Sequence, residues 1–339
     1  MPNITIFGAG ITALAAAYTL PKSHAVTILA ADLPGDDPSS PPSQSAQWVS
    51  PRACAGWVAL GGLTPLEEQM QLDSLSFLRS LALTNPESGV RRAQMTDIHD
   101  EPPPSVWYKD RVPGYTETTN ERGELVTRYQ SVVIDPPKLL LWLRRELEKQ
   151  GTVEFKRIGK VEKLGELSVI PSGGGKVLVN ASGLASQTLQ DVKDEEVVSD
   201  RTYTVRVRSE YTEMFVRRGK GHQYTYVFGR GDGTAVLGGV SVPVDEPLRA
   251  VEEVRGEIIG RVHQSLPEHF PSADPAMYTV VEDLVGIRPL RFAGVRVEKE
   301  RIGDQNVVHA YGTTIGGYIH SFGLARQVAR LVDDFVFQL

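Results

Sequence analysis

The chain has 339 residues, of which 41% are hydrophobic and 23% are charged, and its formal net charge is −6. This acidic balance, without a block of Lys and Arg residues, disfavours nucleic-acid binding, and no apolar run reaches the roughly 20 residues of a membrane-spanning helix. The single cysteine, Cys54, excludes an intrachain disulfide and a multi-cysteine metal site. We therefore expect a soluble intracellular protein without a structural metal.

The first segment, NITIFGAGITALAAAYTL (3–20), predicts a buried strand, a glycine turn and a helix. Gly8 permits the tight turn, Gly10 lets the backbone approach a pyrophosphate, and Ala13 is the small third residue of the pattern. A second strand at 25–30 precedes Asp32, where an acid commonly binds a ribose hydroxyl. The alternative is a glycine turn in another α/β domain, with Asp32 capping a turn. The residues expected to contact a dinucleotide are Gly8, Ala9, Gly10, Ile11, Thr12 and Asp32.

The remaining elements follow from periodicity and from Pro and Gly positions. Residues 173–186 predict a turn, a buried strand and a second glycine break, whose Ser182 and Gly183 can return to the nucleotide site. From residue 203 apolar and polar residues alternate, which indicates antiparallel strands, with the Arg-Gly-Asp at 230–232 as a hairpin tip. In chain order we expect a helix at 64–83, a strand and a helix within 126–151, strands at 203–211 and 224–240, a helix at 247–264, a strand at 306–312 and a helix at 318–337.

Two interleaved domains are therefore expected in an α/β protein, because nucleotide-type elements occur at both ends and in the middle of the chain. The predicted Rossmann-like domain comprises residues 1–55, 135–200 and 276–339. The predicted antiparallel-sheet domain comprises residues 56–134 and 201–275.

Ten segments, in their order and spacing, carry a resemblance to a known family. They are FGAGITALAAA, VTILAADLPGD, SPRACAGW, WYKD, VVIDPPKLLLWL, VNASGLAS, YTVRVRSEY, YTYVFGR, VGIRPLRFAGVRVEKE and VVHAYGTTIGGYIHSFG. With these segments the chain resembles the D-amino acid oxidases, FAD enzymes that include the D-aspartate oxidases. This resemblance implies FAD as cofactor and oxidative deamination: the substrate's α-hydrogen leaves as hydride to the flavin, the imino acid hydrolyses, and O₂ becomes hydrogen peroxide. It also implies a substrate domain whose sheet covers the flavin ring.

Arg288, in the segment LVGIRPLRFAG (284–294), matches the arginine with which the family binds the substrate carboxylate. Its planar fork can hold a carboxylate through two parallel hydrogen bonds, which lysine cannot copy. We expect this guanidinium to lack an anionic partner until substrate arrives. The alternative is a structural arginine paired with an internal acid such as Asp283. Arg291 and Arg296 are expected at surface or structural positions.

The resemblance implies two pocket tyrosines, Tyr226 and Tyr211, and Tyr224 competes with them because it shares a strand face with Tyr226. No side chain is nominated as catalytic acid or base, since hydride transfer needs none if the amine arrives neutral. His320 is the only histidine that we place near the ring, with a structural role preferred. Backbone N–H groups at the start of the last helix are expected to stabilise reduced flavin. These amides are those of Gly316, Gly317, Tyr318 and Ile319.

The chain departs from the family pattern in the flavin-lining segment SPRACAGW, which contains Arg52 and Cys54, and at Ile319. A buried, inert thiol is the preferred interpretation of Cys54. The leading hypothesis is an oxidase of neutral D-amino acids, and an oxidase of acidic D-amino acids is favoured if Arg52 or His222 faces the side-chain pocket. A flavin-binding protein with little activity is the third alternative, and an L-specific or glycine/secondary-amine oxidase is a weaker one. The family resemblance implies a peroxisomal location, but the C-terminus lacks a Ser-Lys-Leu type signal, so a cytoplasmic location is the alternative. A homodimer is left open as the oligomeric state.

Overall fold

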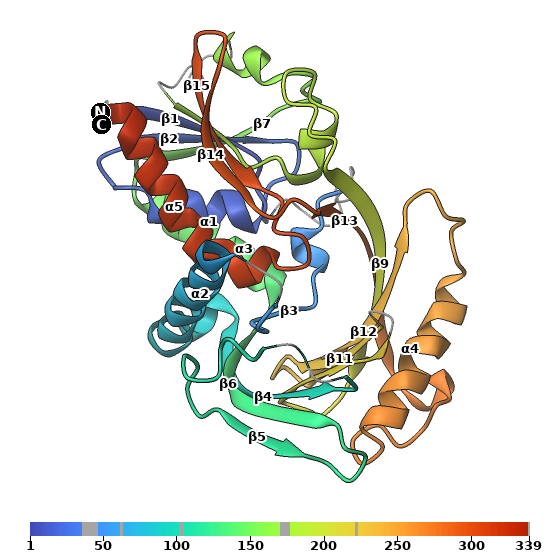
Figure 1. The fold of residues 1–339 in the computed structure, drawn as a ribbon. Coiled ribbons are helices and arrows are strands. Elements are labelled where there is room, and N and C mark those ends of the chain that lie inside the picture. The colour runs from blue at the N-terminus through green and yellow to red at the C-terminus, as the bar shows by residue number, and fades with distance from the viewer. Residues whose placement is uncertain are drawn as a thin grey trace.

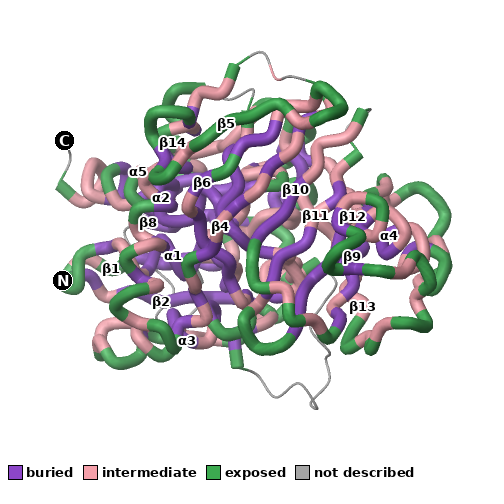
Figure 2. Tube along the Cα trace, turned by 90° about the horizontal axis from the view of Figure 1, so that it is seen from below, coloured by how far each residue is buried: buried purple, intermediate pink, exposed green. Residues whose placement is uncertain are grey.

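The structure is a computed structural model that describes residues 1–35, 47–61, 64–101, 103, 105–169, 177–220 and 223–337. Two sheets make up its framework, and helices cover their outer faces (Figure 1). Buried residues follow the strands of both sheets, whereas exposed residues concentrate on the outer loops (Figure 2). None of the helices in these described ranges is long and apolar enough to cross a membrane.

The first sheet, sheet A, has six strands in the order β14-β15-β8-β1-β2-β7. Its central strands are apolar runs and pair in parallel, as expected for strands that are buried on both faces. Helix α1, rich in alanine, packs closely against helix α5. The bounds are β1 Asn3–Phe7, β2 Ala25–Ala30, β7 Val153–Arg157, β8 Val177–Asn180, β14 Arg296–Ile302, β15 Gln305–Tyr311, α1 Ile11–Thr19, α3 Pro136–Lys149 and α5 Gly317–Phe337.

The second sheet, sheet B, has the strand order β13-β9-β12-β11-β10-β4-β6-β3, and β5 pairs with β6. All its pairs are antiparallel except that of β10 with β4. Helix α4 covers one face, where it buries a cluster of aliphatic and aromatic side chains. The bounds are β3 Ala55–Gly56, β4 Val90–His99, β5 Thr116–Thr119, β6 Leu125–Ile134, β9 Val197–Arg208, β10 Met214–Arg218, β11 Tyr224–Gly229, β12 Thr234–Pro243, β13 Val280–Arg291, α2 Pro65–Thr84 and α4 Val251–Ser265.

Strand β13 corrects the predicted domain boundary. Residues 276–339 were expected in the nucleotide domain, but Val280–Arg291 pairs antiparallel with β9 and belongs to sheet B. The strand lies at the edge of its sheet, which is where a proline such as Pro289 can be accommodated without losing a ladder hydrogen bond. The return to sheet A therefore occurs at β14, after residue 291.

Helix α2 joins the two parts of the molecule because it packs against α5 as well as against β4 and β6 of sheet B. The rings of Phe77 and Phe322 stack with centroids 3.8 Å apart. At Gly323 a Cβ would lie only 2.0 Å from the Met70 carbonyl oxygen, so this crossing requires glycine. The two sheets thus share one continuous core.

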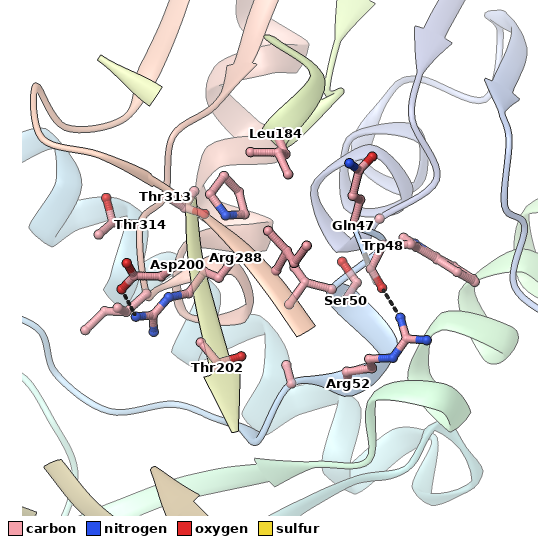
Figure 3. Close-up of a pocket in the computed structure, with 18 of the residues that line it drawn as sticks. Gln47, Trp48, Ser50, Arg52, Leu184, Asp200, Thr202, Arg288, Thr313 and Thr314 are labelled. Atoms are coloured by element: carbon pink, nitrogen blue, oxygen red, sulfur yellow. Dashed lines mark hydrogen bonds and ion pairs between the residues drawn. The ribbon is translucent and has the colours of Figure 1, made fainter. Parts of the chain in front are cut away.

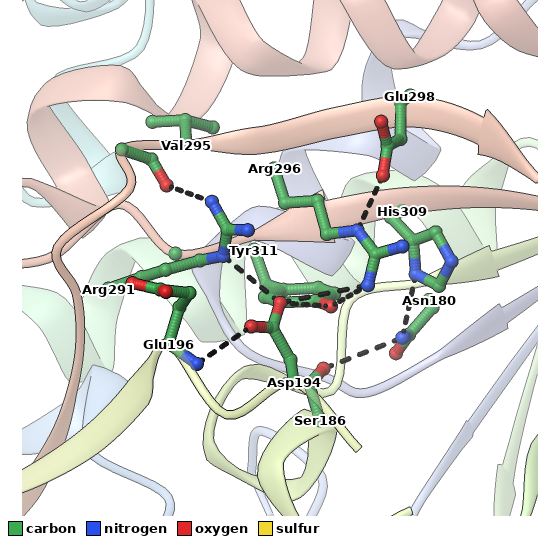
Figure 4. A network of polar contacts seen from close by, with 12 residues as sticks. Asn180, Ser186, Asp194, Glu196, Arg291, Val295, Arg296, Glu298, His309 and Tyr311 are labelled. Carbon is green, nitrogen blue, oxygen red and sulfur yellow. Dashed lines mark hydrogen bonds and ion pairs between the residues drawn. The ribbon is translucent and has the colours of Figure 1, made fainter. Parts of the chain in front are cut away.

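A buried polar network at the junction of β13, β14 and β15 is centred on Asp194 (Figure 4). Its Oδ2 accepts hydrogen bonds from the Tyr311 hydroxyl at 2.8 Å and from Arg291 Nε at 3.0 Å. Arg296 donates to Tyr311 at 2.8 Å and lies 3.6 Å from the same carboxylate. Arg291 and Arg296 therefore hold three chain segments together, in agreement with the structural role expected for them.

Replacing Asp194 with asparagine is expected to lower the free energy of unfolding at pH 7 by about 3 kcal/mol, since the partly buried Arg291 loses its anion while Arg296 keeps only Glu298 and Glu300. Burial alone would raise the pKa of Asp194, but hydrogen bonds from Tyr311 and Arg291 outweigh it and lower this pKa. Stability from the carboxylate is therefore present above its ordinary pKa and lost as pH falls through the lowered one. Urea unfolding should show a difference from wild type that shrinks below about pH 4. The exposed Asp304→Asn is the control, and an equal loss there would contradict the assignment.

Candidate active site

One cavity of about 1260 Å³ extends from sheet A to the inner face of sheet B. Strands β1, β2, β8 and β15 are parallel, so their carboxyl ends meet at one edge, and the residues after each of them line the cavity. Ligands of doubly wound sheets bind at this edge. The volume exceeds the roughly 300–1,000 Å³ of ordinary small-molecule sites, which leaves room for a dinucleotide and a substrate.

The turn between β1 and α1 fits a phosphate group by its backbone. Gly8 has a φ of +116°, and a Cβ there would lie 2.5 Å from the Ala181 carbonyl oxygen, so only glycine fits. Gly10 is the N-cap of α1 and supplies no capping side chain. The helix N-terminus therefore presents backbone N–H groups to the cavity, which is the arrangement that binds pyrophosphate. These features fit a dinucleotide.

The predicted cofactor residues come together around this cavity with one exception. The residues that line it are Gly8, Ala9, Gly10, Ile11, Thr12, Asp32, Ser182, Gly183, Gly317, Tyr318 and Ile319. Gly316 is not among the lining residues, because it forms the turn before α5, where its N–H donates to Thr313. His320 also lies away from the cavity: it is buried, and its Nδ1 lies 3.0 Å from the Gly316 carbonyl oxygen.

The segment that departs from the family pattern lines the same cavity through Arg52, Cys54 and Gly56. The Tyr318 hydroxyl donates to the Ser50 carbonyl at 2.9 Å and so fixes this segment to the start of α5. Burial raises the pKa of the Cys54 thiol to about 12, so the thiol is protonated at neutral pH. This pKa fits the predicted inert thiol, but Cys54 is only partly buried and lines the cavity. His222 lies outside the described residues.

Arg288 lines the part of the cavity formed by sheet B (Figure 3). Its Nη2 lies 3.3 Å from Asp200 Oδ2 and donates to the Ser241 hydroxyl at 3.0 Å. Its Nε is buried and has no hydrogen-bond partner in the described structure. The expectation that this guanidinium lacks an anionic partner is therefore wrong, because Asp200 is that partner, and Nε alone is left without a hydrogen bond. The alternative partner, Asp283, instead pairs with Arg255.

The structure brings two tyrosines to this region, Tyr226 and Tyr224, but not Tyr211. Tyr226 packs beneath Gly238 and Gly239, where a Cβ on either glycine would overlap its ring. Burial raises the pKa of Tyr226, and the nearby arginines oppose this only in part, so the phenol remains a hydrogen-bond donor at neutral pH.

Tyr211 lies in the turn between β9 and β10, on the face of sheet B that α4 covers. Its ring contacts those of His269 and Phe270 at centroid distances of 5.0 and 6.1 Å. The backbone of this turn lies so close to Gly229 that a Cβ at Gly229 would be 2.1 Å from the Tyr211 carbonyl oxygen, so this approach requires glycine. Its predicted place in the pocket is therefore not observed.

Sequence reasoning missed several polar groups that line the cavity. Asp200 and Ser241 surround Arg288, and the separation of these residues along the chain hides their contact. Arg218 also lines the cavity and is held by the fully buried Asp97 through hydrogen bonds of 2.7–3.1 Å. The one signal in the sequence that could have pointed to these residues is the alternation of charged and apolar residues in their strands. No group of His, Cys, Asp and Glu residues suited to a metal occurs within the described ranges.

Comparisons with known proteins agree with this geometry. The sequence model of a family described as FAD dependent oxidoreductase matches residues 3–331. The chain is 28% identical to a D-aspartate oxidase of Talaromyces thermophilus, over 98% of this chain and 95% of that protein. It is 27% identical to a D-amino-acid oxidase of Fusarium vanettenii, over 98% of this chain and 96% of that protein. The crystal structure of glycine oxidase from Geobacillus kaustophilus covers 100% of this chain and 95% of its own, with a TM-score of 0.71 and 16% identity, and confirms the predicted fold class.

Proposed function

Since this chain belongs to the family of FAD-dependent oxidoreductases, with FAD as its cofactor, we propose that it is a D-amino acid oxidase. The reaction converts a D-amino acid to an imino acid, which hydrolyses to a keto acid and ammonia, while dioxygen is reduced to hydrogen peroxide. Bound FAD would supply the two-electron acceptor for this oxidation. The protein supplies binding, orientation and exclusion of water.

The residues that would hold FAD are those at the carboxyl edge of sheet A. The N–H groups at the N-terminal end of α1, which follows Gly10, would take the pyrophosphate, and Asp32 would take a ribose hydroxyl. The N-terminal end of α5, from Gly317 to Ile319, would place its N–H groups against the part of the flavin that gains negative charge.

The buried Nε of Arg288 is the observation on which the substrate proposal depends. A buried donor without a partner is costly, and the side chain that carries this donor lines the cavity in which a ligand would bind. A planar carboxylate fits Nε together with an Nη donor. We assign the substrate carboxylate to this position. The hydroxyl of Tyr226 would add a further donor from strand β11 of the same sheet.

Fixing the carboxylate also fixes the α-carbon, and such positioning can contribute several kcal/mol to lowering a barrier. No histidine or carboxylate is assigned as general base. Proton removal is not required of the protein if the substrate amine is neutral when it reacts. Arg288 and Tyr226 are therefore binding residues that act by orientation.

An oxidase of acidic D-amino acids is the second candidate. Arg52 lines the cavity, and Arg261, whose Nε is buried without a hydrogen-bond partner in the described structure, lines it as well. Either cation could receive a side-chain carboxylate. The related protein from Talaromyces thermophilus bears the name D-aspartate oxidase.

Anaerobic titration of the purified holoprotein with D-alanine, D-phenylalanine, D-aspartate and their L-enantiomers tests both candidates. We expect the flavin absorption to bleach with D-amino acids only, and hydrogen peroxide to appear when air is admitted. Bleaching by D-aspartate alone would establish the acidic specificity. A bound flavin that none of the D-amino acids bleaches would overturn the proposal in favour of a flavin-binding protein with little oxidase activity.

A further inference from the structure

Asp200, Ser241 and Arg288 form a small polar cluster on the cavity wall, which we call the Asp200 cluster (Figure 3). Asp200 of β9 lies directly opposite Arg288 of β13 in the antiparallel register, and β12 pairs with the other side of β9. The Ser241 hydroxyl donates to Asp200 Oδ2 at 2.7 Å, and Arg288 Nη2 donates to the same hydroxyl at 3.0 Å. The sheet itself therefore places a fixed carboxylate beside the proposed substrate-binding arginine.

The ion pair between Asp200 and Arg288 is loose. Its 3.3 Å separation is longer than the roughly 2.7–2.9 Å of a strong charge-assisted hydrogen bond, and it uses Nη2 alone. The two side chains keep 24% and 18% of their surfaces exposed, so solvent weakens their attraction. A ligand that binds Arg288 through two donors can displace such a contact.

A ligand carboxylate that binds Arg288 is attracted by the guanidinium and repelled by the carboxylate of Asp200. A ligand that uses Nη2 must take it from Asp200 Oδ2, and two carboxylates on one guanidinium repel each other. Ser241 cannot relieve this conflict, since its hydroxyl donates its proton to Asp200. The cluster therefore contains an internal competitor for the ligand.

We propose that Asp200 is a specificity-determining residue whose carboxylate competes with the substrate carboxylate for Arg288 and thereby lowers the affinity of the site for carboxylates. This inference rests on the proposed function, because it takes Arg288 as the carboxylate-binding group. Asp200 is a positioning residue for Arg288 and takes no part in the chemistry.

The test uses the FAD-containing protein and propionate, a carboxylate that cannot be deaminated. Propionate binding is followed by the change in flavin absorption in the wild type and in Asp200→Asn. We expect Asp200→Asn to bind propionate about fivefold more tightly, which corresponds to about 1 kcal/mol. The KM for the best D-amino acid should fall in parallel, with kcat little changed. Asp200→Ala is a second variant that should behave in the same way.

Asp245→Asn is the matched control, because it makes the same change of one aspartate to asparagine. Asp245 follows β12, is exposed and does not line the cavity. It should leave the propionate Kd within twofold of wild type. Propanamide, which carries no charge, should bind the wild type and all three variants with equal affinity.

The two proposals fail in different ways. If the wild type oxidises D-amino acids but Asp200→Asn and Asp200→Ala leave the propionate Kd and the KM unchanged, the competition by Asp200 is overturned and the oxidase stands. If propionate perturbs the flavin and binds Asp200→Asn more tightly, but no D-amino acid is oxidised, the oxidase is overturned and the competition stands. A flavin that propionate does not perturb in any variant overturns the competition.

Discussion

Arg288→Ala should yield a folded, FAD-containing protein that has lost nearly all turnover of D-amino acids. Each of the two hydrogen bonds to the substrate carboxylate would contribute about 1.5–3 kcal/mol because both partners are charged. Their loss predicts a fall in kcat/KM of roughly 10²–10⁴-fold. In addition, the carboxylate of Asp200 would remain on the cavity wall and repel the substrate. Oxygen consumption gives the kinetics, and the flavin absorption gives the FAD content.

Two further variants make this result specific. Arg288→Lys keeps the charge but loses the planar fork, so its activity should lie between those of wild type and Arg288→Ala. Arg301→Ala removes a guanidinium that is 68% exposed and should have normal kinetics. Normal kinetics in Arg288→Ala itself would rule out the carboxylate assignment and leave Arg288 as a structural partner of Asp200.

The central elements of sheet A could be predicted from the sequence because each has a local signal. The apolar residues Ile4, Ile6 and Phe7 are followed at once by Gly8 and Gly10, so strand, turn and helix are all specified within a few residues. Pro65 and Pro136 start their helices as expected. For these elements, the residues within and next to each one were sufficient to predict it.

Seven strands were not predicted, namely β3, β4, β5, β7, β10, β13 and β14, and most of them are short, peripheral or rich in charge. β14, with the sequence RVEKERI, and β7, with VEFKR, lie at the two edges of sheet A. Edge strands tolerate charged side chains because one side has no neighbour, and this weakens the alternation that identifies a strand. β4 alternates buried and partly exposed residues, but its arginines, Asp97 and His99 obscure the pattern.

In the site, too, the residues that share one strand could be predicted from the sequence, whereas contacts between different strands could not. Tyr224 and Tyr226 both line the cavity, as their spacing of two along one strand predicts. The contact between Asp200 and Arg288 depends on the register of β9 against β13, which no local pattern specifies. The position of Tyr211 likewise depends on which way a turn curls. Periodicity therefore predicted which residues share a face, but not which faces meet.

Gly10→Val should produce a folded protein that is purified without the yellow colour of FAD. Gly10 has an extended backbone that any residue can adopt, and a Cβ there would meet only the Ser50 hydroxyl at 2.9 Å, a side chain that can rotate. The apoprotein should therefore fold. Valine would, however, place its branched side chain where the backbone must approach the pyrophosphate. We expect FAD binding to weaken by about 3 kcal/mol, roughly a hundredfold in Kd.

Gly260→Val is the matched control, because a Cβ at Gly260 of α4 meets no atom within 4 Å. This variant should retain FAD and turn over substrate like the wild type. Circular dichroism and thermal unfolding of both apoproteins separate a loss of FAD from a loss of structure, since a steric block at Gly10 leaves the helical signal intact. A yellow Gly10→Val protein with wild-type FAD affinity would contradict the pyrophosphate assignment, because it would show that the backbone at Gly10 need not approach the cofactor.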